Sequence, residues 1–119
     1  MENINQFIFE VGGHGDLQTL KLMDDGRIVV KLGLAKIPWF YKGELEHKPT
    51  QEKWSEFLAE LDSIQVWDWE TSYHRTDMCD GSMWELFLST DSKSIKSYGS
   101  GLFPEKFNDF KAALDRLLS

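Results

Sequence analysis

Residues 24–34 read DDGRIVVKLGL, and this stretch sets the expected fold. Its Asp25-Gly26 pair is one that type I′ hairpin turns prefer. After the pair, apolar side chains fall on alternate positions, at Ile28, Val30, Leu32 and Leu34. A period of two is typical of a strand with one buried face. The stretch therefore predicts a tight hairpin whose second strand runs through about Leu34.

The residues before this hairpin predict two further strands. Phe7, Phe9 and Val11 alternate across residues 6–11, and GGHG at 12–15 allows a reversal into a second strand over 17–23. The glycine run lacks the GxxxxGK[ST] pattern of a phosphate-binding loop, and a strand pattern follows it where such a loop would open a helix. We expect an antiparallel meander of three strands.

Two amphipathic helices are predicted. Trp54, Phe57, Leu58 and Leu61 follow the N-cap candidate Thr50 at helical spacing, which indicates a helix over about 51–62. A second apolar stripe begins near Pro104, a residue suited to a first helical turn, and predicts a closing helix over about 104–118. Its members are Phe103, Phe107, Phe110, Leu114 and Leu117.

The segment between the helices predicts a second meander. Residues 64–73 are rich in strand formers, residues 83–88 alternate around Trp84, and Asp91-Ser92 can turn that strand into a partner over about 93–98. Since the hairpin connections are short, we expect an antiparallel sheet. The conformation of 35–49 stays open, with a short edge strand over 39–42 and then a loop as our interpretation.

Together these segments predict one α+β domain over residues 1–119. The expected order is β-β-β-α-β-β-β-α, with two meanders forming the sheet and both helices packed on it.

Composition narrows the classes of function. The 119 residues carry a formal charge of -7, which repels the phosphate backbone and disfavours nucleic-acid binding. The single cysteine, Cys79, fits a reducing compartment. The first residues lack the features of a signal peptide, and no apolar run approaches the ~20 residues of a membrane span. We therefore expect a cytoplasmic protein without membrane association.

The loop over residues 74–81 gathers the groups that a metal or nucleophile site uses, namely His74, Asp77, Cys79 and Asp80. Their spacing does not match the paired ligands of a zinc site. A thiolate activated by His74 lacks an evident third group to orient it. We interpret the segment as a polar loop, and we predict no catalytic residue, cofactor or metal.

Aromatic and acidic side chains around VWDWE at 66–70 form the candidate binding surface. Two of the rings fall on one side of the expected strand and are core candidates, but together with the aromatic run at 39–41 they could also line a groove. Such a groove suits an apolar ligand, a sugar ring or a basic peptide. The candidate binding residues are Trp39, Tyr41, Trp67, Asp68, Trp69, Glu70, Tyr73 and His74.

The C-terminal half also resembles small uncharacterised bacterial proteins. The resemblance covers about a third of the chain and is carried by a Trp-containing strand after Asp-Gly, a glycine-bearing turn and a Pro-started helix with Phe anchors. The matching stretches are DGSMWEL (80–86), SYG (97–99), FPEKF (103–107) and AL (113–114). The resemblance implies a bacterial domain of unknown function, and some similar acidic proteins are immunity partners of toxins.

Two functions remain open. The first is a non-enzymatic acidic protein that binds a protein partner, expected to be basic, as an inhibitor or immunity factor would; it needs an exposed apolar patch rimmed by acid. The second is a small-molecule-binding protein or small enzyme with an aromatic pocket between sheet and helices, which needs a cavity of at least ~300 Å³.

Overall fold

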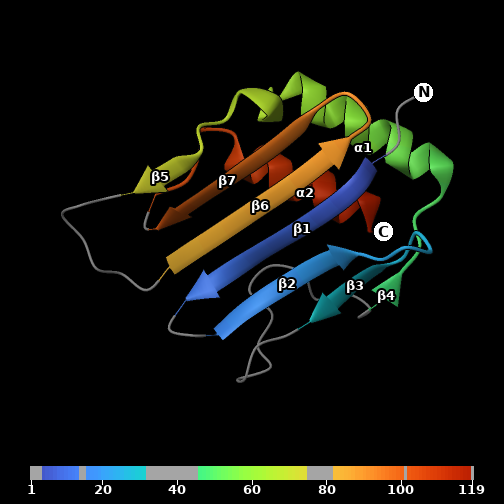
Figure 1. Cartoon of the computed structure of the whole chain (residues 1–119), viewed down its shortest axis with the longest axis horizontal. Coiled ribbons are helices and arrows are strands. Elements are labelled where there is room, and N and C mark those ends of the chain that lie inside the picture. The colour runs from blue at the N-terminus through green and yellow to red at the C-terminus, as the bar shows by residue number, and fades with distance from the viewer. Residues whose placement is uncertain (1–3, 14–15, 32–45, 75–81, 101, 119) are drawn as a thin grey trace.

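The computed structural model describes residues 4–13, 16–31, 46–74, 82–100 and 102–118 (Figure 1). These residues form strands β1 (Ile4–Gly13), β2 (Asp16–Leu22), β3 (Ile28–Lys31), β4 (Glu46–His47), β5 (Ser72–His74), β6 (Ser82–Thr90) and β7 (Ser94–Ser100). The helical elements are α1 (Gln51–Ser63), the short 3₁₀ helix η1 (Val66–Asp68) and α2 (Phe107–Leu117).

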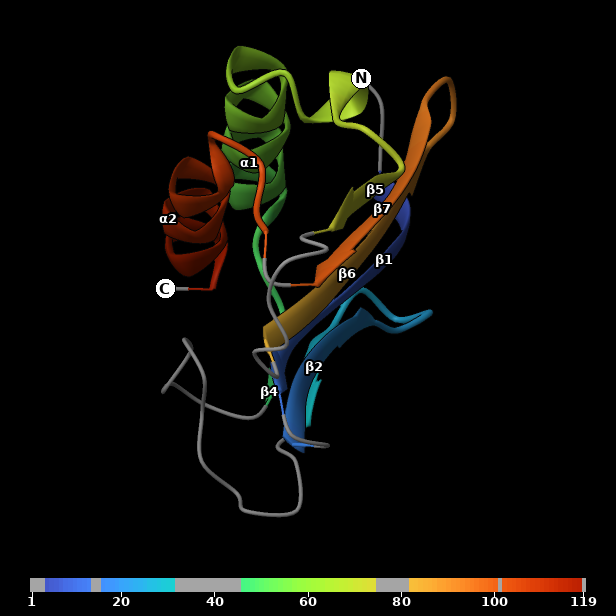
Figure 2. The same ribbon diagram turned by 90° about the vertical axis from the view of Figure 1, so that its left-hand side faces the viewer.

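The described strands form one mixed sheet in the order β4-β3-β2-β1-β6-β7-β5. The central strand β1 pairs antiparallel with β2 on one side and with β6 on the other. Both helices lie on the same face of the sheet, and no described element covers the opposite face (Figure 2). The expected α+β class, with both helices packed on one sheet, is confirmed.

An aromatic cluster fills the space between the sheet and the helices. Phe9 of β1 lies 5.2 Å from Phe110 of α2, and Phe7 lies 6.1 Å from Phe57 of α1, measured between ring centroids. All four rings are buried. The alternation that predicted the inward face of β1 thus places its two phenylalanines against both helices.

The β2–β3 hairpin forms where residues 24–34 predicted it, but its turn differs. Gly26 has a φ of 89°, and its N–H donates to the Met23 carbonyl at 3.0 Å, while the Met23 N–H donates to the Arg27 carbonyl at 2.8 Å. A type I′ turn needs positive φ at both central residues, and Gln65 is the one described non-glycine residue with positive φ. The predicted type I′ turn is therefore wrong, and the loop has three residues with glycine in the last position.

Helix α1 matches its prediction closely. The Thr50 hydroxyl caps it by accepting the Lys53 N–H at 3.2 Å. Phe57 and Leu61 are buried, and Trp54 and Leu58 are half-buried.

Helix α2 starts later than expected. The Phe107 N–H donates to the Pro104 carbonyl at 3.0 Å in a turn that precedes the helix. Four members of the predicted stripe are buried in α2, namely Phe107, Phe110, Leu114 and Leu117. Phe103 lies before the helix and is 38% exposed, so its expected place in the stripe is wrong.

The predicted strand over 64–73 is wrong, and with it the expected second meander of three strands, although the predicted hairpin around Asp91-Ser92 forms as β6 and β7. Gln65 turns the chain with a left-handed φ of 59°, and η1 follows it. Strand β5 keeps only Ser72 and Tyr73 of that segment and adds His74. It pairs parallel with β7, so the sheet is mixed and not wholly antiparallel as expected. The reason is that β1 already occupies the edge of β6 that faces away from β7, which leaves β5 the free edge of β7.

Two further expectations concern the segment before α1. Residues 46 and 47, expected in a loop, form β4, which pairs antiparallel with β3 through Ile28 and His47. The short edge strand expected over 39–42 lies outside the described residues.

The left-handed turn at Gln65 gives a direct stability prediction. A side chain in this conformation costs about 1–2 kcal/mol, and glycine avoids most of that cost. Gln65→Gly should therefore raise the free energy of unfolding by about 0.5–1 kcal/mol in urea denaturation, after the extra freedom of glycine in the unfolded chain is subtracted. Gln65→Ala, which keeps a Cβ, should show no such gain. A glycine variant less stable than the alanine variant would contradict the assigned conformation.

Candidate functional site

Trp67, one of the predicted binding residues, connects three elements. Its indole Nε1 donates to the Asp62 carboxylate of α1 at 2.8 Å. The ammonium of Lys93, in the β6–β7 turn, lies 5.6 Å from the Trp67 ring centroid and 3.6 Å from the same carboxylate. The half-buried Trp67 thus holds η1 against α1 and against the β6–β7 turn.

Trp69 and Tyr73 pack on the core from the same segment. The Trp69 ring lies 5.7 Å from Phe110 and 6.1 Å from Trp84, between centroids. The Tyr73 ring lies 5.8 Å from Trp84, and its hydroxyl accepts the Glu70 N–H at 3.0 Å. The structure therefore brings these two predicted rings together around Trp84, and both are half-buried.

The remaining predicted residues divide into two groups. Asp68 and Glu70 are exposed beside the packed rings. The backbone of His74 belongs to β5, but its side chain lies outside the described part of the structure, as do Trp39 and Tyr41. Asp77, Cys79 and Asp80, expected in a polar loop, lie outside it too.

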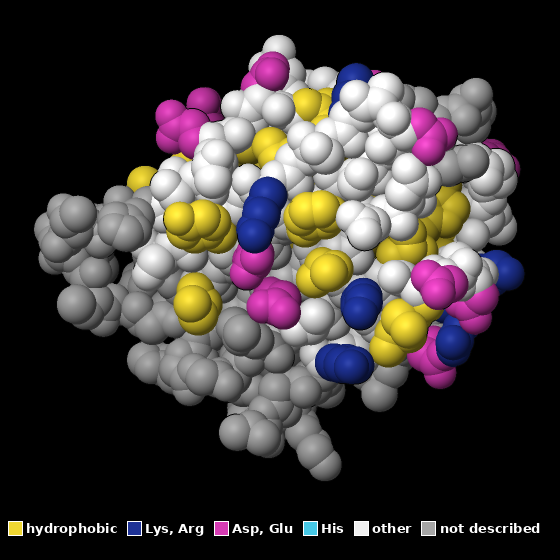
Figure 3. Space-filling view, in the orientation of Figure 1, with side chains coloured by type: hydrophobic (Ala, Val, Ile, Leu, Met, Phe, Trp, Pro, Cys, Tyr) yellow, Lys and Arg dark blue, Asp and Glu magenta, His cyan; other side chains and the backbone are white. Residues whose placement is uncertain are grey.

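The face of the sheet that the helices do not cover, here called the open sheet face, carries two rows of side chains. The cross-strand pairing defines the members of each row. One row runs Lys21, Ile8, Phe87, Lys96 across β2, β1, β6 and β7, and the next runs Thr19, Glu10, Glu85, Tyr98. Figure 3 views this face, where hydrophobic side chains lie among basic and acidic ones. The face is thus neither a plain polar surface nor a uniform apolar one.

A shallow groove of about 440 Å³ lies at the β6–β7 side of this face, and we call it the sheet groove. Met83 and Tyr98, both 46% exposed, provide its apolar surface. Its polar side chains are Glu10, Glu85, Lys96 and Ser100.

Two like charges meet in the sheet groove. Glu10 and Glu85 are direct cross-strand partners. Like charges in this position repel and destabilise a sheet. None of the ion pairs found among the described residues includes either carboxylate. The groove therefore presents two adjacent acidic groups beside an exposed phenol ring, with the basic side chain of Lys96 also in its lining.

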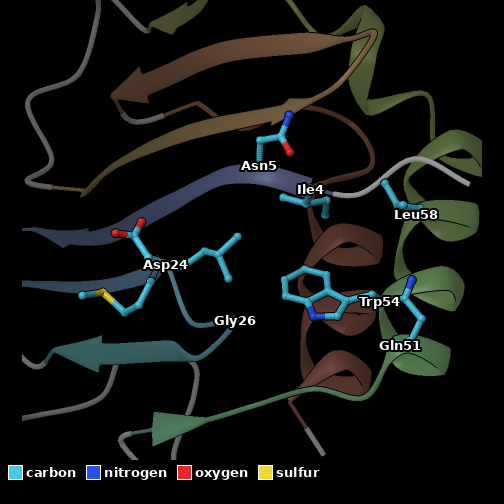
Figure 4. Close-up of a pocket in the computed structure, with 9 residues that line it drawn as sticks. Ile4, Asn5, Asp24, Gly26, Gln51, Trp54 and Leu58 are labelled. Carbon is cyan, nitrogen blue, oxygen red and sulfur yellow. The ribbon is translucent and has the colours of Figure 1, made fainter.

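A second cavity of about 340 Å³ lies between α1 and the β2–β3 hairpin (Figure 4), and we call it the hairpin cavity. Its apolar lining consists of Ile4, Leu22, Met23, Trp54 and Leu58, and its polar side chains are Asn5, Asp24 and Gln51. It shares no lining residue with the sheet groove.

No family model, curated protein or solved structure matches this chain. Its function is therefore inferred from the chemistry of the two sites. Within the described residues, no three His, Cys, Asp or Glu side chains gather where a metal ion could be held. Neither α1 nor α2 has the length and apolar character of a membrane span.

The sequence pattern indicated these site residues only in part. Within each strand, alternation turns Glu10 away from the face that carries Phe9, and Glu85 away from the face that carries Trp84. Both glutamates are therefore expected on the outward face. That the two glutamates meet depends on the β1–β6 register, which joins segments about 75 residues apart and leaves no local signal.

Proposed function

We propose that this chain is a non-enzymatic binding protein, inhibitor-like in mode, that docks a protein partner on its open sheet face. The partner inserts an arginine side chain into the sheet groove. The observation that carries the proposal is the cross-strand pair of Glu10 and Glu85 beside exposed Tyr98.

The chemistry of the groove favours a guanidinium group. A planar cation can donate several hydrogen bonds to carboxylates and stack on an aromatic ring at the same time. Inserted between Glu10 and Glu85, it would relieve their mutual repulsion, while Tyr98 and Met83 would contact its face and its methylene stem. A chain with a formal charge of -7 also attracts a basic partner over distance.

The distribution of side chains on the face favours a protein partner. A stable protein interface covers roughly 800 Å² on each side, with an apolar centre and a polar rim. Half-buried Ile8 and Phe87 lie beside the groove, with Lys21 and Lys96 at the two ends of their row. This arrangement of an apolar centre with charges around it suits a partner whose own surface is mixed and bears an arginine beside its apolar centre.

The first test uses N-acetyl-arginine methylamide as a probe of the anchor position. We expect it to shift the backbone amide signals of Glu10, Glu85 and Tyr98 in a ¹⁵N-labelled sample. The citrulline counterpart, which has the same shape without the charge, should bind about three- to tenfold more weakly, as should arginine to the Glu85→Gln variant. Equal binding of the two probes would overturn the proposal.

The same variant should reveal the cost of the acidic pair in the free protein. Glu85→Gln removes one of two opposed charges, so we expect the free energy of unfolding to rise by about 0.2–1 kcal/mol. This gain in stability should shrink in about 1 M salt, because the Debye length is then about 3 Å and the repulsion between the two carboxylates is screened. Urea denaturation at low and high salt measures both values. A loss of stability at low salt would mean that the pair is not repulsive.

A further inference from the structure

We propose that the partner docks with an extended segment that carries an aromatic side chain two residues away from its arginine. The arginine occupies the row of Glu10 and Glu85, and the aromatic ring covers the neighbouring apolar row. This inference rests on the proposed docking role of the open sheet face and specifies the part of the partner that the face recognises. It is carried by the spacing, the exposure and the charge of the two rows.

The two rows occupy successive outward positions on the central strands β1 and β6. Glu10 pairs with Glu85 across these strands. Ile8 pairs with Phe87 two positions further along. Residues two apart on a strand point to the same face and lie about 7 Å from each other. The seam between β1 and β6 therefore carries an acidic pair and an apolar pair at that separation.

An extended segment that runs along the seam matches this separation. Its own side chains at positions i and i+2 also point to one side and lie about 7 Å apart. A segment that crosses the strands meets a new strand about every 4.8 Å, so its side chains do not coincide with the rows. Packed β-layers also keep their strands within about 30° of each other. The two anchors are therefore positions i and i+2 of a segment aligned with β1 and β6.

The apolar row provides the place for the second anchor. Ile8 and Phe87 are half-buried, whereas Lys21 and Lys96 at the two ends of the same row are exposed. Figure 3 shows hydrophobic side chains between basic ones on this face. A hollow of about 420 Å³ has Ile8, Phe87 and Lys21 in its lining. An aromatic ring placed there removes apolar surface from water, and the methylene stems of the lysines can cover its edges.

Charge determines which anchor lies over which row. Among the described residues, the lining of the sheet groove has two carboxylates and one ammonium group, from Glu10, Glu85 and Lys96. The lining of the hollow has one of each, from Asp24 and Lys21. A cation is therefore attracted more strongly to the sheet groove, and a neutral ring is the better occupant of the hollow. The reverse register would place the cation in the row that has a lysine at each end.

The test compares three tripeptides, each acetylated at its N-terminus and amidated at its C-terminus. Arg-Ala-Phe has the proposed spacing, Arg-Phe-Ala has the same composition with adjacent anchors, and Arg-Ala-Ala lacks the second anchor. Each is titrated into the ¹⁵N-labelled full chain, and the backbone amides of Ile8, Glu10, Glu85 and Phe87 report binding. We expect Arg-Ala-Phe to bind about three- to tenfold more tightly than either of the others.

Two variants locate the second anchor. Phe87→Ala should lower the affinity for Arg-Ala-Phe to within about twofold of that for Arg-Ala-Ala, and it should barely change the affinity for Arg-Ala-Ala. Val29→Ala is the matched control, because Val29 is half-buried and lies on the same face, on β3 beside Lys21. It should leave the affinity for Arg-Ala-Phe within about twofold. If Phe87→Ala does not fold, Ile8→Ala shortens the other side chain of the pair and should act in the same direction.

The outcomes separate this inference from the proposed function. If N-acetyl-arginine methylamide shifts Glu10 and Glu85 but Arg-Ala-Phe binds no better than Arg-Phe-Ala, the second anchor is wrong and the docking role stands. Equal losses of affinity in Phe87→Ala and Val29→Ala would overturn the second anchor in the same way. If neither the arginine probe nor any tripeptide shifts these amides at millimolar concentration, the proposed function fails, and this inference fails with it.

Discussion

Replacing Phe110 by alanine should lower the free energy of unfolding by about 3–5 kcal/mol, because the ring is fully buried and its removal leaves a cavity. Phe110 lies within 6.4 Å of Phe9, Phe57, Trp69 and Phe107, between ring centroids, and so joins the sheet to both helices. A loss of this size should lower the unfolding midpoint by about 10–20 °C. Thermal unfolding followed by circular dichroism measures it.

Phe103→Ala is the matched control for this prediction. The same side chain is removed, but Phe103 is 38% exposed and lies before the helix. Its contacts are with Phe107 at 4.8 Å and Trp84 at 6.3 Å, between centroids, so we expect a loss of about 1 kcal/mol. Equal losses in the two variants would mean that α2 does not pack on the sheet as described.

Gly99→Ala should be nearly as damaging, although it adds only one methyl group. A Cβ on Gly99 would collide with the indole Nε1 of Trp84, and it would lie 2.6 Å from the Leu102 carbonyl oxygen. That nitrogen donates to that oxygen at 3.0 Å, so the methyl group would strain the backbone and displace a hydrogen bond. We expect a loss of about 3 kcal/mol or more in urea denaturation.

Gly26→Ala is the control that distinguishes a steric clash from backbone strain. Gly26 has a positive φ of 89°, but the nearest atom to an added Cβ is the flexible Lys48 side chain at 3.5 Å. Gly26→Ala should therefore cost only the strain of the turn, about 1–2 kcal/mol. In addition, Gly99→Ala should change the near-ultraviolet circular dichroism of the Trp84 environment, and Gly26→Ala should not. A Gly99 variant as stable as the Gly26 variant would contradict the packing around Trp84.

The sequence predicted those elements whose signals are local. The period-two alternation at Phe7 and Phe9 and the helical spacing of Phe57 and Leu61 each lie within one element, and each buries the expected face. The hairpin at Asp91-Ser92 also forms, with the Thr90 N–H donating to the Lys93 carbonyl at 2.7 Å.

The elements that were missed depend on distant partners. Residues 64–73 have the composition of a strand, but helix α1 ends at Ser63, and the chain then turns at Gln65 to pack Trp69 on the core. The Ser97 hydroxyl donates to the Glu70 carbonyl at 2.5 Å, and the Tyr98 N–H donates to the Thr71 carbonyl at 2.9 Å. These bonds hold the segment beside β7. They depend on residues of β7, so the sequence of 64–73 alone does not predict them.

The candidate sites follow the same division. The outward position of Glu85 follows from alternation within β6, but its pairing with Glu10 requires the register between two strands far apart in the sequence. The hairpin cavity likewise combines β1, the β2–β3 hairpin and α1. By contrast, the candidate binding residues predicted around VWDWE (66–70) include Trp67 and Tyr73, whose polar atoms form hydrogen bonds within the fold.

The proposed docking role of the uncovered sheet face is tested most directly by intermolecular nuclear Overhauser effects with N-acetyl-arginine methylamide. We expect contacts between the side-chain methylenes of the probe and the ring protons of Tyr98, and between the same methylenes and the Met83 methyl group. These contacts should disappear in the Glu10→Gln, Glu85→Gln double variant while the fold is retained. Contacts confined to Trp54, or to the helical layer, would contradict the proposed role of this face.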